Sequence, residues 1–183
     1  MKEFLLVFLA IILANVTYEF VCLIYEVVAS RKSIGRGFEI VSDEFRAYPN
    51  VDIQLPKRGT SKSMAYDFFS PIEYELYPGE KILIFTDIKA YMQDGEALIL
   101  NPRSSMGKLD LTFANTQGWI DCDYYSNESN DGNIGIYLKN NGREIVKIKV
   151  GDRIGQGAFI PFLVADNGNT DEVRKGGYGS TGK

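Results

Sequence analysis

Short runs of β-branched and aromatic residues alternate with turn-forming pairs from Phe38 onward. Such runs, bounded by Gly, Pro, Asn and Asp, are typical of β-strands. They predict strands over residues 38–42, 51–55, 73–77, 81–86, 97–100, 133–138 and 144–150. The pairs between them supply the positive or fixed φ angles of tight turns, namely Pro78-Gly79, Asp94-Gly95, Asn141-Gly142 and Gly151-Asp152. Many short strands at regular spacing predict an all-β sandwich, barrel or jelly roll.

The N-terminal part of the chain has a different pattern of hydrophobic positions. Residues 4–18 contain no charge, and the apolar character continues to residue 29 with Glu19 and Glu26 as interruptions. A basic cluster at residues 31–36 closes the segment. The tail from residue 167 is polar and rich in glycine, which is typical of an arm without core contacts. These patterns predict an apolar N-terminal extension of residues 1–34, a β domain of residues 35–166 and a C-terminal arm of residues 167–183.

Three interpretations of residues 1–33 compete: a membrane anchor, a secretory signal, or an upstream frame translated from a mistaken start. A span needs about 20 predominantly apolar residues, and Glu19 and Glu26 would each cost roughly 2.5 to 3.5 kcal/mol near a bilayer centre. If the segment spans, the basic cluster after it favours a cytoplasmic β domain. We expect a dispensable helical extension and a cytoplasmic protein, with membrane association through residues 4–29 only if the extension is real.

Composition narrows the chemistry further. A chain of 183 residues with 45% hydrophobic composition can bury one core of ordinary domain size. A formal net charge of −4 argues against nucleic acid as a partner, because gripping a phosphate backbone requires a basic face. The chain has no histidine, so a general base must be Asp, Glu, Tyr, Lys or Cys. Cys22 and Cys122 lie far apart, which favours neither a disulfide framework nor a zinc site and indicates a reducing compartment.

Two segments concentrate groups that a core does not need. Residues 101–107 read NPRSSMG and offer a guanidinium, two hydroxyls and loop N–H groups, a set suited to a phosphate or carboxylate. The competing interpretation is a polar turn before a strand. Residues 117–125 place Asp121 and Asp123 two apart, so that in extended backbone both would point to one face and one could act as a general base. Paired acids also occur on solvated strand edges.

Two further segments are weaker alone. Residues 151–156, GDRIGQ, ordinarily form a hairpin turn that enters a strand. Residues 174–182, RKGGYGSTG, combine a cation, glycines, one aromatic and two hydroxyls, although a disordered tail has a similar composition. Glycine-rich loops bring backbone N–H groups close to phosphates, and an aromatic ring can stack on a base. Together the four segments supply anion donors and acids without a metal cluster, which indicates a site for a nucleotide phosphate.

Five segments in this order resemble the five motifs of trimeric dUTPases, from about residue 35 to the end and with most likeness to Gram-positive bacterial or phage enzymes. The segments are Ala65-Tyr66-Asp67 and residues 102–107, 118–124, 151–156 and 174–182. The resemblance implies a distorted jelly roll of the dUTPase-like β-clip type, a homotrimer with active sites between subunits, and a C-terminal arm that closes each site. It also implies hydrolysis of dUTP to dUMP and pyrophosphate, which keeps uracil out of DNA and supplies dUMP for thymidylate synthesis. Mg²⁺ would be bound mainly by the triphosphate.

Residue roles follow from the same resemblance. Asp121 corresponds to the acid that orients and deprotonates the attacking water. Tyr124 would pack on the deoxyribose and leave no space for a 2′-hydroxyl, and Asn115 with the backbone near Gly118 would read the uracil edge. Asp67 would support the water shell of the metal. The phosphate cradle would comprise Arg103, Ser104, Ser105 and Gln156, and the closing arm would contribute Arg174, Tyr178, Ser180 and Thr181.

The sequence departs from the family pattern at Ala65 and Ser126, where the family usually has Gly, and at Trp119 and Tyr178, where it has an aliphatic residue and Phe. Two alternative functions come from this scaffold. A dCTP deaminase-like enzyme resembles residues 103–109 and 118–121, but Tyr137 stands where that family has its catalytic Glu. A phage-type regulatory protein would use the dUTPase scaffold to bind a protein partner.

Overall fold

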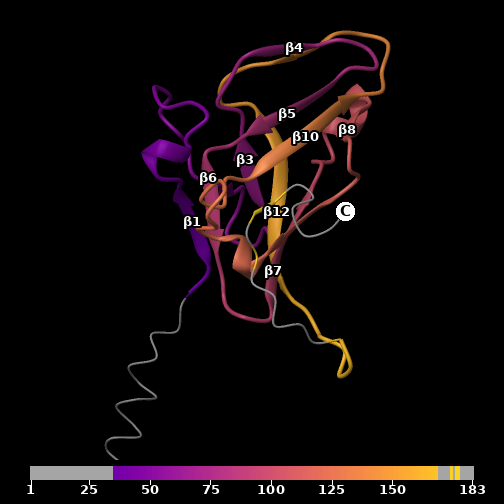
Figure 1. Ribbon diagram of the computed structural model, residues 1–183. Coiled ribbons are helices and arrows are strands. Elements are labelled where there is room, and N and C mark those ends of the chain that lie inside the picture. Colours follow the sequence, from indigo (N-terminus) through magenta and orange to yellow (C-terminus); the bar gives the residue numbers. More distant parts are fainter. Residues whose placement is uncertain (1–34, 169–173, 175, 178–183) are drawn as a thin grey trace, which may run out of the picture. The chain divides into compact units, whose positions relative to one another are not determined.

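The computed structural model describes residues 35–168, 174, 176 and 177 (Figure 1). The expected extension of residues 1–34 lies outside the described residues, as do Tyr178, Ser180 and Thr181 of the expected arm. Within the described part of the chain, no helix is long and apolar enough to cross a membrane.

The prediction of an all-β fold is confirmed. The described residues form strands joined by three short 3-10 helices, η1 (Asp43–Phe45), η2 (Met106–Leu109) and η3 (Cys122–Tyr124). The strands are β1 (Gly37–Ile40), β2 (Lys57–Arg58), β3 (Tyr66–Phe69), β4 (Tyr74–Leu76), β5 (Lys81–Phe85), β6 (Ile88–Tyr91), β7 (Glu96–Asn101), β8 (Leu111–Phe113), β9 (Gly118–Asp121), β10 (Gly135–Asn140), β11 (Val146–Ile148) and β12 (Arg153–Pro161).

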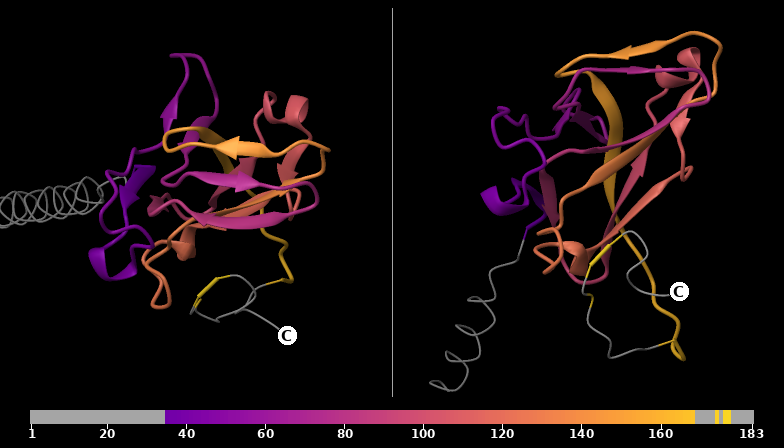
Figure 2. Two further views of the ribbon diagram at one scale, coloured as in Figure 1. Left: turned by 90° about the horizontal axis from the view of Figure 1, so that it is seen from above. Right: turned by 45° about the horizontal axis from the view of Figure 1, so that its top comes forward.

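Antiparallel pairing arranges these strands in four sheets that surround one interior (Figures 1 and 2). The largest sheet has the order β2-β3-β12-β7-β9, and a second has the order β5-β10-β8. The pairs β4-β11 and β1-β6 complete the fold. Because β12 pairs with both β3 and β7, it brings three of the motif segments side by side.

The core fills the space between the two larger sheets. Phe68 and Leu98 come from the five-stranded sheet and Ile84 and Leu138 from the three-stranded one, and all four are fully buried. The two sheets pack closely at Gly155, where a Cβ would lie 2.9 Å from Phe113 Cζ and 3.0 Å from Ile136 Cδ1. Glycine is therefore required at this point of β12, because a side chain would push the sheets apart.

Six of the seven predicted strands correspond to β1, β4, β5, β7, β10 and β11, and the predicted strand over residues 51–55 is wrong. The Val51 N–H donates to the Tyr48 carbonyl at 3.1 Å, and Arg46 Nη2 donates to the Val51 carbonyl at 2.5 Å. These local bonds occupy backbone groups that a strand would offer to a neighbour. The next strand along the chain is β2, which pairs with β3.

Backbone conformation settles which of the expected turn positions need glycine. Gly79, Gly95 and Gly151 have φ angles of 79°, 80° and 83°, as tight turns require. Ala65 is not among the residues with positive φ, so its Cβ carries no such penalty. Ser126 has φ of 52°, which explains in physical terms why glycine is common after the tyrosine of this motif.

Candidate active site

A hollow of about 170 Å³ lies beside β9 and η3. β9 pairs with β7 so that Gly118 lies opposite Leu100, and a Cβ on Gly118 would lie 3.1 Å from Leu100 Cβ. A side chain at Gly118 would therefore crowd Leu100 on β7. The hollow is lined by Leu100, Asn115, Gly118, Trp119, Ile120, Asp121, Tyr124, Gly135, Arg174 and Gly177. We call it the base-side hollow, because it gathers the residues expected to bind the nucleoside.

Asp121 and Asp123 do not share an extended strand, which corrects the period-two argument made from the sequence. The chain leaves β9 at Asp121 and turns at once into η3, so Asp123 lies on a 3-10 turn. The two carboxylates nevertheless meet at one partner. Arg174 donates from Nη2 to Asp121 Oδ2 and from Nε to Asp123 Oδ1, the latter at 2.7 Å.

Tyr124 forms a fixed wall of the base-side hollow. Its side chain is buried, and its hydroxyl donates to the Asn133 carbonyl at 2.9 Å and accepts from Asn130 Nδ2 at 2.7 Å. The loop that supplies these partners is held by Asp131, which accepts from the Ser42 N–H at 2.7 Å. The ring therefore keeps one orientation, as a residue that selects a ligand by shape requires.

Cys122 lies next to Asp121 but lacks the environment of a nucleophile. Burial raises the pKa of its thiol, and the nearby carboxylates of Asp94 and Asp123 raise it further. A thiol is nucleophilic as its thiolate, and these surroundings disfavour that form at neutral pH. Covalent catalysis through Cys122 is therefore disfavoured.

The second group of predicted residues meets where β3, β12 and β7 lie side by side. Register places Gln156 opposite Asp67 on one side and Asn101 on the other. Arg103, which follows β7, donates from Nε to Asp67 Oδ1 at 2.7 Å. Gln156 Nε2 donates to the Pro102 carbonyl at 3.2 Å and thereby ties β12 to the Arg103 loop.

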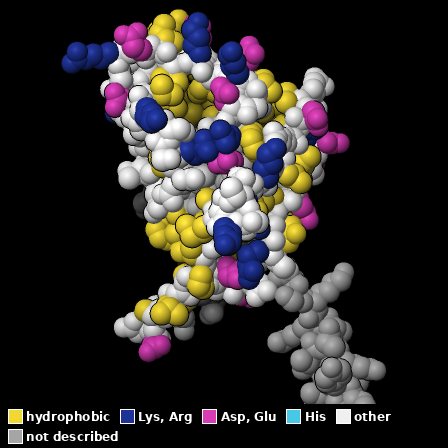
Figure 3. All heavy atoms as spheres, turned by 180° about the vertical axis from the view of Figure 1, so that it is seen from behind, with side chains coloured by type: hydrophobic (Ala, Val, Ile, Leu, Met, Phe, Trp, Pro, Cys, Tyr) yellow, Lys and Arg dark blue, Asp and Glu magenta, His cyan; other side chains and the backbone are white. Residues whose placement is uncertain are grey.

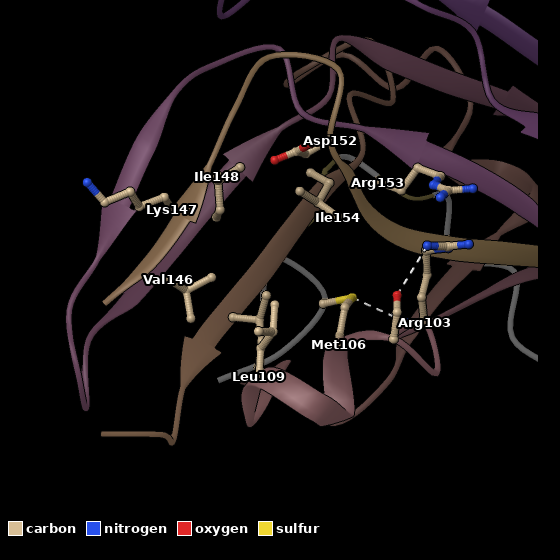
Figure 4. Close-up of a pocket in the computed structure, with 11 residues that line it drawn as sticks. Arg103, Met106, Leu109, Val146, Lys147, Ile148, Asp152, Arg153 and Ile154 are labelled. Carbon is tan, nitrogen blue, oxygen red and sulfur yellow. Dashed lines mark hydrogen bonds between the residues drawn. The ribbon is translucent and has the colours of Figure 1, made fainter. Parts of the chain in front are cut away.

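Of these residues, Arg103 also lines a second hollow of about 240 Å³, which we call the phosphate-side hollow. Arg103 and Arg153 lie together at one end, and Leu109, Val146 and Ile154 line the rest (Figure 4). Ser105 also lines it and accepts from Arg103 Nη1 at 3.3 Å. Lys and Arg side chains also gather across the middle of one face of the molecule (Figure 3), although the chain carries a formal net charge of −4.

The described residues bear on the expected divalent metal through their donor groups. Among them, no group of three or more His, Cys, Asp or Glu side chains is arranged to hold an ion. Mg²⁺ keeps several waters and is commonly bound through one or two carboxylates together with substrate phosphates. The donor set therefore fits an ion that arrives with a triphosphate. Asp67 lies beside Arg103 and Arg153, and its expected place in the water shell of the metal stays a prediction.

Comparison with known proteins identifies the family. The dUTPase family model matches residues 51–182. This chain belongs to the dUTPase family. It is 45% identical over 150 residues to a deoxyuridine 5′-triphosphate nucleotidohydrolase of Lactococcus lactis subsp. lactis, covering 80% of this chain and 97% of that protein. A mitochondrial human protein of the same name is 35% identical over 133 residues, covering 70% of this chain and 50% of that protein.

Solved structures share the fold. The crystal structure of dUTPase from Streptococcus mutans aligns with a TM-score of 0.62 and 39% identity, covering 72% of this chain and 99% of that chain. The dUTPase from phage phi11 of S. aureus aligns with a TM-score of 0.58 at 22% identity, covering 75% of this chain and 96% of that chain, and supports the fold alone. The predicted resemblance to the dUTPases of Gram-positive bacteria is therefore confirmed at the level of the family.

The dUTPase motifs fall into two sets in this chain. Asn115, Gly118, Asp121, Tyr124 and Arg174 meet at the base-side hollow, whereas the phosphate-side set contains Asp67, Arg103, Ser105 and Gln156. Ser104 lines neither hollow. Sequence reasoning missed Leu100 and Gly135 as lining residues, since both are ordinary strand residues without a local signal. It named the motif segments that contain Trp119, Ile120 and Gly177 but gave these residues no role in the site.

Proposed function

We propose that this chain hydrolyses dUTP to dUMP and pyrophosphate. The observation that carries the proposal is that the base-side hollow gathers Asp121, Tyr124 and Asn115 in a member of the dUTPase family. The dUTPase family model spans residues 51–182, which include these residues, and a relative that is 45% identical is named for this reaction. The reaction keeps uracil out of DNA and supplies dUMP for thymidylate synthesis.

In the proposed reaction a water molecule attacks the triphosphate, and the anhydride bond between the α- and β-phosphates breaks. Asp121 accepts the proton of that water, a role open to a carboxylate in a chain without histidine. Its side chain is 53% exposed, so water can reach it. Asp121 is also the group that contacts the sugar 3′-hydroxyl in this proposal, which fixes the nucleotide relative to the base.

Specificity is assigned to the wall and floor of the base-side hollow. Tyr124, fixed through Asn130 and Asn133, packs on the deoxyribose and leaves no space for a 2′-hydroxyl. Asn115 and the backbone near Gly118 bind the edge of uracil. A ring held in one orientation by its hydroxyl group cannot turn aside for an added 2′-hydroxyl, so it rejects that group sterically.

Charge stabilisation is assigned to the phosphate-side hollow and the arm. Arg103, Ser104, Ser105 and Gln156 cradle the phosphates, and Mg²⁺ bound by the triphosphate neutralises part of its charge. Arg174, Ser180 and Thr181 close over the terminal phosphates while Tyr178 stacks on uracil. Closure excludes bulk water and holds the substrate in place.

A homotrimer with sites between subunits accounts for the separation of the two hollows. The base-side and phosphate-side hollows share no lining residue in the described chain. A single nucleotide must contact both sets, so we propose that the base-side set of one subunit meets the phosphate-side set of another. Residues 1–34 are proposed to be a dispensable extension of this cytoplasmic assembly, and residues 167–183 its closing arm.

Product analysis tests the proposed reaction against deamination. Tyr137 lies on β10, where Lys81 Nζ is 5.9 Å from its ring centroid, and offers no carboxylate at the position expected for a deaminase base. Incubation with dUTP and Mg²⁺ should yield dUMP and pyrophosphate by ion-exchange chromatography, and dCTP should release no ammonia. Formation of dUTP from dCTP would contradict the assignment. Binding of a protein partner without any nucleotide turnover would instead favour the regulatory alternative.

A further inference from the structure

Arg174 lines the base-side hollow and pairs with Asp121 and Asp123. Its side chain is 18% exposed, whereas those of Asp121 and Asp123 are 53% and 54% exposed. The guanidinium donates to both carboxylates and, from Nη1, to the Gly176 carbonyl at 3.3 Å. It also lies 5.9 Å from the centroid of the Tyr124 ring. The cation is thus surrounded by the groups that would face the nucleotide.

Gly177 brings the same part of the arm against the wall of the hollow. A Cβ on Gly177 would lie 2.6 Å from Tyr124 Cε2 and 3.1 Å from its hydroxyl oxygen. Only glycine permits this approach, because a real Cβ does not come so close to a ring. Arg174 and Gly177 therefore lie against Asp121 and Tyr124, the groups that the proposed reaction assigns to the water and the deoxyribose.

These contacts conflict with the catalytic role of Asp121. Asp121 Oδ2 accepts from Arg174, so this oxygen must be released before it can accept the proton of a water. A triphosphate carries several negative charges and forms charge-assisted hydrogen bonds with arginine, so it can draw the guanidinium away. Asp123 opposes the movement of Arg174 to the triphosphate, because it accepts a hydrogen bond from Nε of the same guanidinium.

We propose that Asp123 sets the affinity for the substrate by competing with the triphosphate for Arg174. The inference rests on the proposed function for the identity of the nucleotide. Asp123 favours the arrangement in which Arg174 pairs with both carboxylates, and the nucleotide favours the arrangement in which Arg174 has moved to phosphate. A ligand shifts such an equilibrium only through its different affinity for the two states. Asp123 is a positioning residue in this scheme and touches no reacting atom.

The competition is modest in size because both carboxylates are more than half exposed. Exposed ion pairs change an equilibrium by about 1.4-fold to fivefold. We therefore expect Asp123→Ala to lower the KM for dUTP about two- to fivefold. The kcat should change less than KM, because Asp123 touches no reacting atom. A merely structural role for Asp123 predicts the opposite sign, since damage to η3 would weaken nucleotide binding.

Arginine-specific proteolysis measures the contact without nucleotide. Cleavage after Arg174 requires its side chain to leave the carboxylates and enter the protease, and mass spectrometry identifies the fragment. In the full-length protein, Asp123→Ala should be cleaved there about two- to fivefold faster than the wild type. Asp123→Asn, which keeps an acceptor oxygen and loses the charge, should lie between them. Asp94→Asn is the matched control, because Asp94 is near Cys122 yet is not a partner of Arg174.

The two measurements separate the inference from the proposed function. Faster cleavage with a lower KM in Asp123→Ala, and neither change in Asp94→Asn, supports the competition. Equal cleavage of Asp123→Ala and wild type, or a raised KM in the variant, overturns it. If the wild type hydrolyses no dUTP, the proposed function and the competition both fail. Even then, faster cleavage of Asp123→Ala than of the wild type would establish the contact between Arg174 and Asp123.

Discussion

The two arginine–carboxylate pairs of the site are built differently. Arg103 and Asp67 have side chains only 21% and 11% exposed, and Asp67 lies on β3 in the middle of a hydrogen-bonded sheet. Arg174 instead belongs to the C-terminal arm and pairs with carboxylates that are more than half exposed. The first pair is part of the fold and costs free energy to break. The second is an exposed pair of small net free energy, which a charged ligand can replace.

This difference indicates that the Arg103–Asp67 pair is a fixed part of the fold, whereas Arg174 can exchange its carboxylate partners for a charged ligand. Breaking the first pair should therefore change the free energy of unfolding, whereas changes on the arm should alter turnover and leave the fold intact. The following predictions test that division, and they run from the largest expected effect to the smallest.

Asp121→Asn should reduce kcat at least about 100-fold, the lower range for removal of a general base, which corresponds to about 2.7 kcal/mol in the activation barrier. The amide keeps the shape of the side chain, so binding of a nonhydrolysable dUTP analogue should persist in calorimetry. Near-normal pyrophosphate release by this variant would show that another group is the base.

Asp67→Asn should lower the free energy of unfolding by about 2 kcal/mol, because it removes the charge that balances the poorly exposed Arg103. Urea denaturation of variant and wild type measures the change. Glu75→Gln is the matched control, since it breaks the exposed Glu75–Lys147 pair and should change the unfolding free energy far less. Equal effects of the two substitutions would remove the contrast between fixed and exchangeable pairs.

Deletion of residues 174–183 should leave a folded trimer and reduce kcat/KM roughly tenfold, or about 1.4 kcal/mol in transition-state stabilisation. The reason is that the arm contributes charge and closure to the site but is not part of the buried core. Size-exclusion chromatography with light scattering gives the assembly state. Dissociation into monomers would mean that the arm holds the assembly together.

Asp131→Asn should destabilise the protein by about 1 kcal/mol at neutral pH. Burial alone raises the pKa of the Asp131 carboxyl, but the Ser42 N–H and the Lys89 ammonium outweigh burial and leave this pKa below its usual value. Such a group adds stability above its unfolded pKa of about 3.9, and the added stability is lost as the pH falls through the lower folded value. Thermal unfolding from pH 7 to pH 3 should show the gap between wild type and variant closing, and a constant gap would contradict this origin.

The sequence predicted the all-β class and six strands, because turn pairs such as Pro78-Gly79 and Asp94-Gly95 mark strand ends through backbone geometry. It missed β12 as a nine-residue strand, since Gly155 and Gly157 imitate a loop in the sequence. These two glycines instead allow close packing, since a Cβ on Gly157 would lie 2.8 Å from Leu100 Cδ2. Such a need is set by residues distant in the chain and has no local signature.

The candidate site was predictable as a set of motifs but not as a geometry. Asp121 and Asp123 were assigned to one face of a strand, yet they meet at Arg174 because η3 turns the chain. The pairing of β3 with β12 places Asp67 against Arg103, a contact that the sequence did not predict, and the expected role of Asp67 near a metal stays a prediction. The turn at η3 is local, but the contacts with Arg174 and Arg103 join residues more than 30 positions apart, which spacing along the chain does not encode. The roles of Tyr178, Ser180 and Thr181 stay predictions.

Steady-state pyrophosphate release from dUTP, UTP, dCTP and dTTP, each with and without Mg²⁺, tests the central claim most directly. The account predicts turnover of dUTP with Mg²⁺ that exceeds turnover of UTP at least about tenfold, because Tyr124 excludes the 2′-hydroxyl. Release from dCTP and dTTP should be lower still, since Asn115 and the backbone near Gly118 are assigned to the uracil edge. Equal turnover of UTP and dUTP, or no release from dUTP, would contradict it.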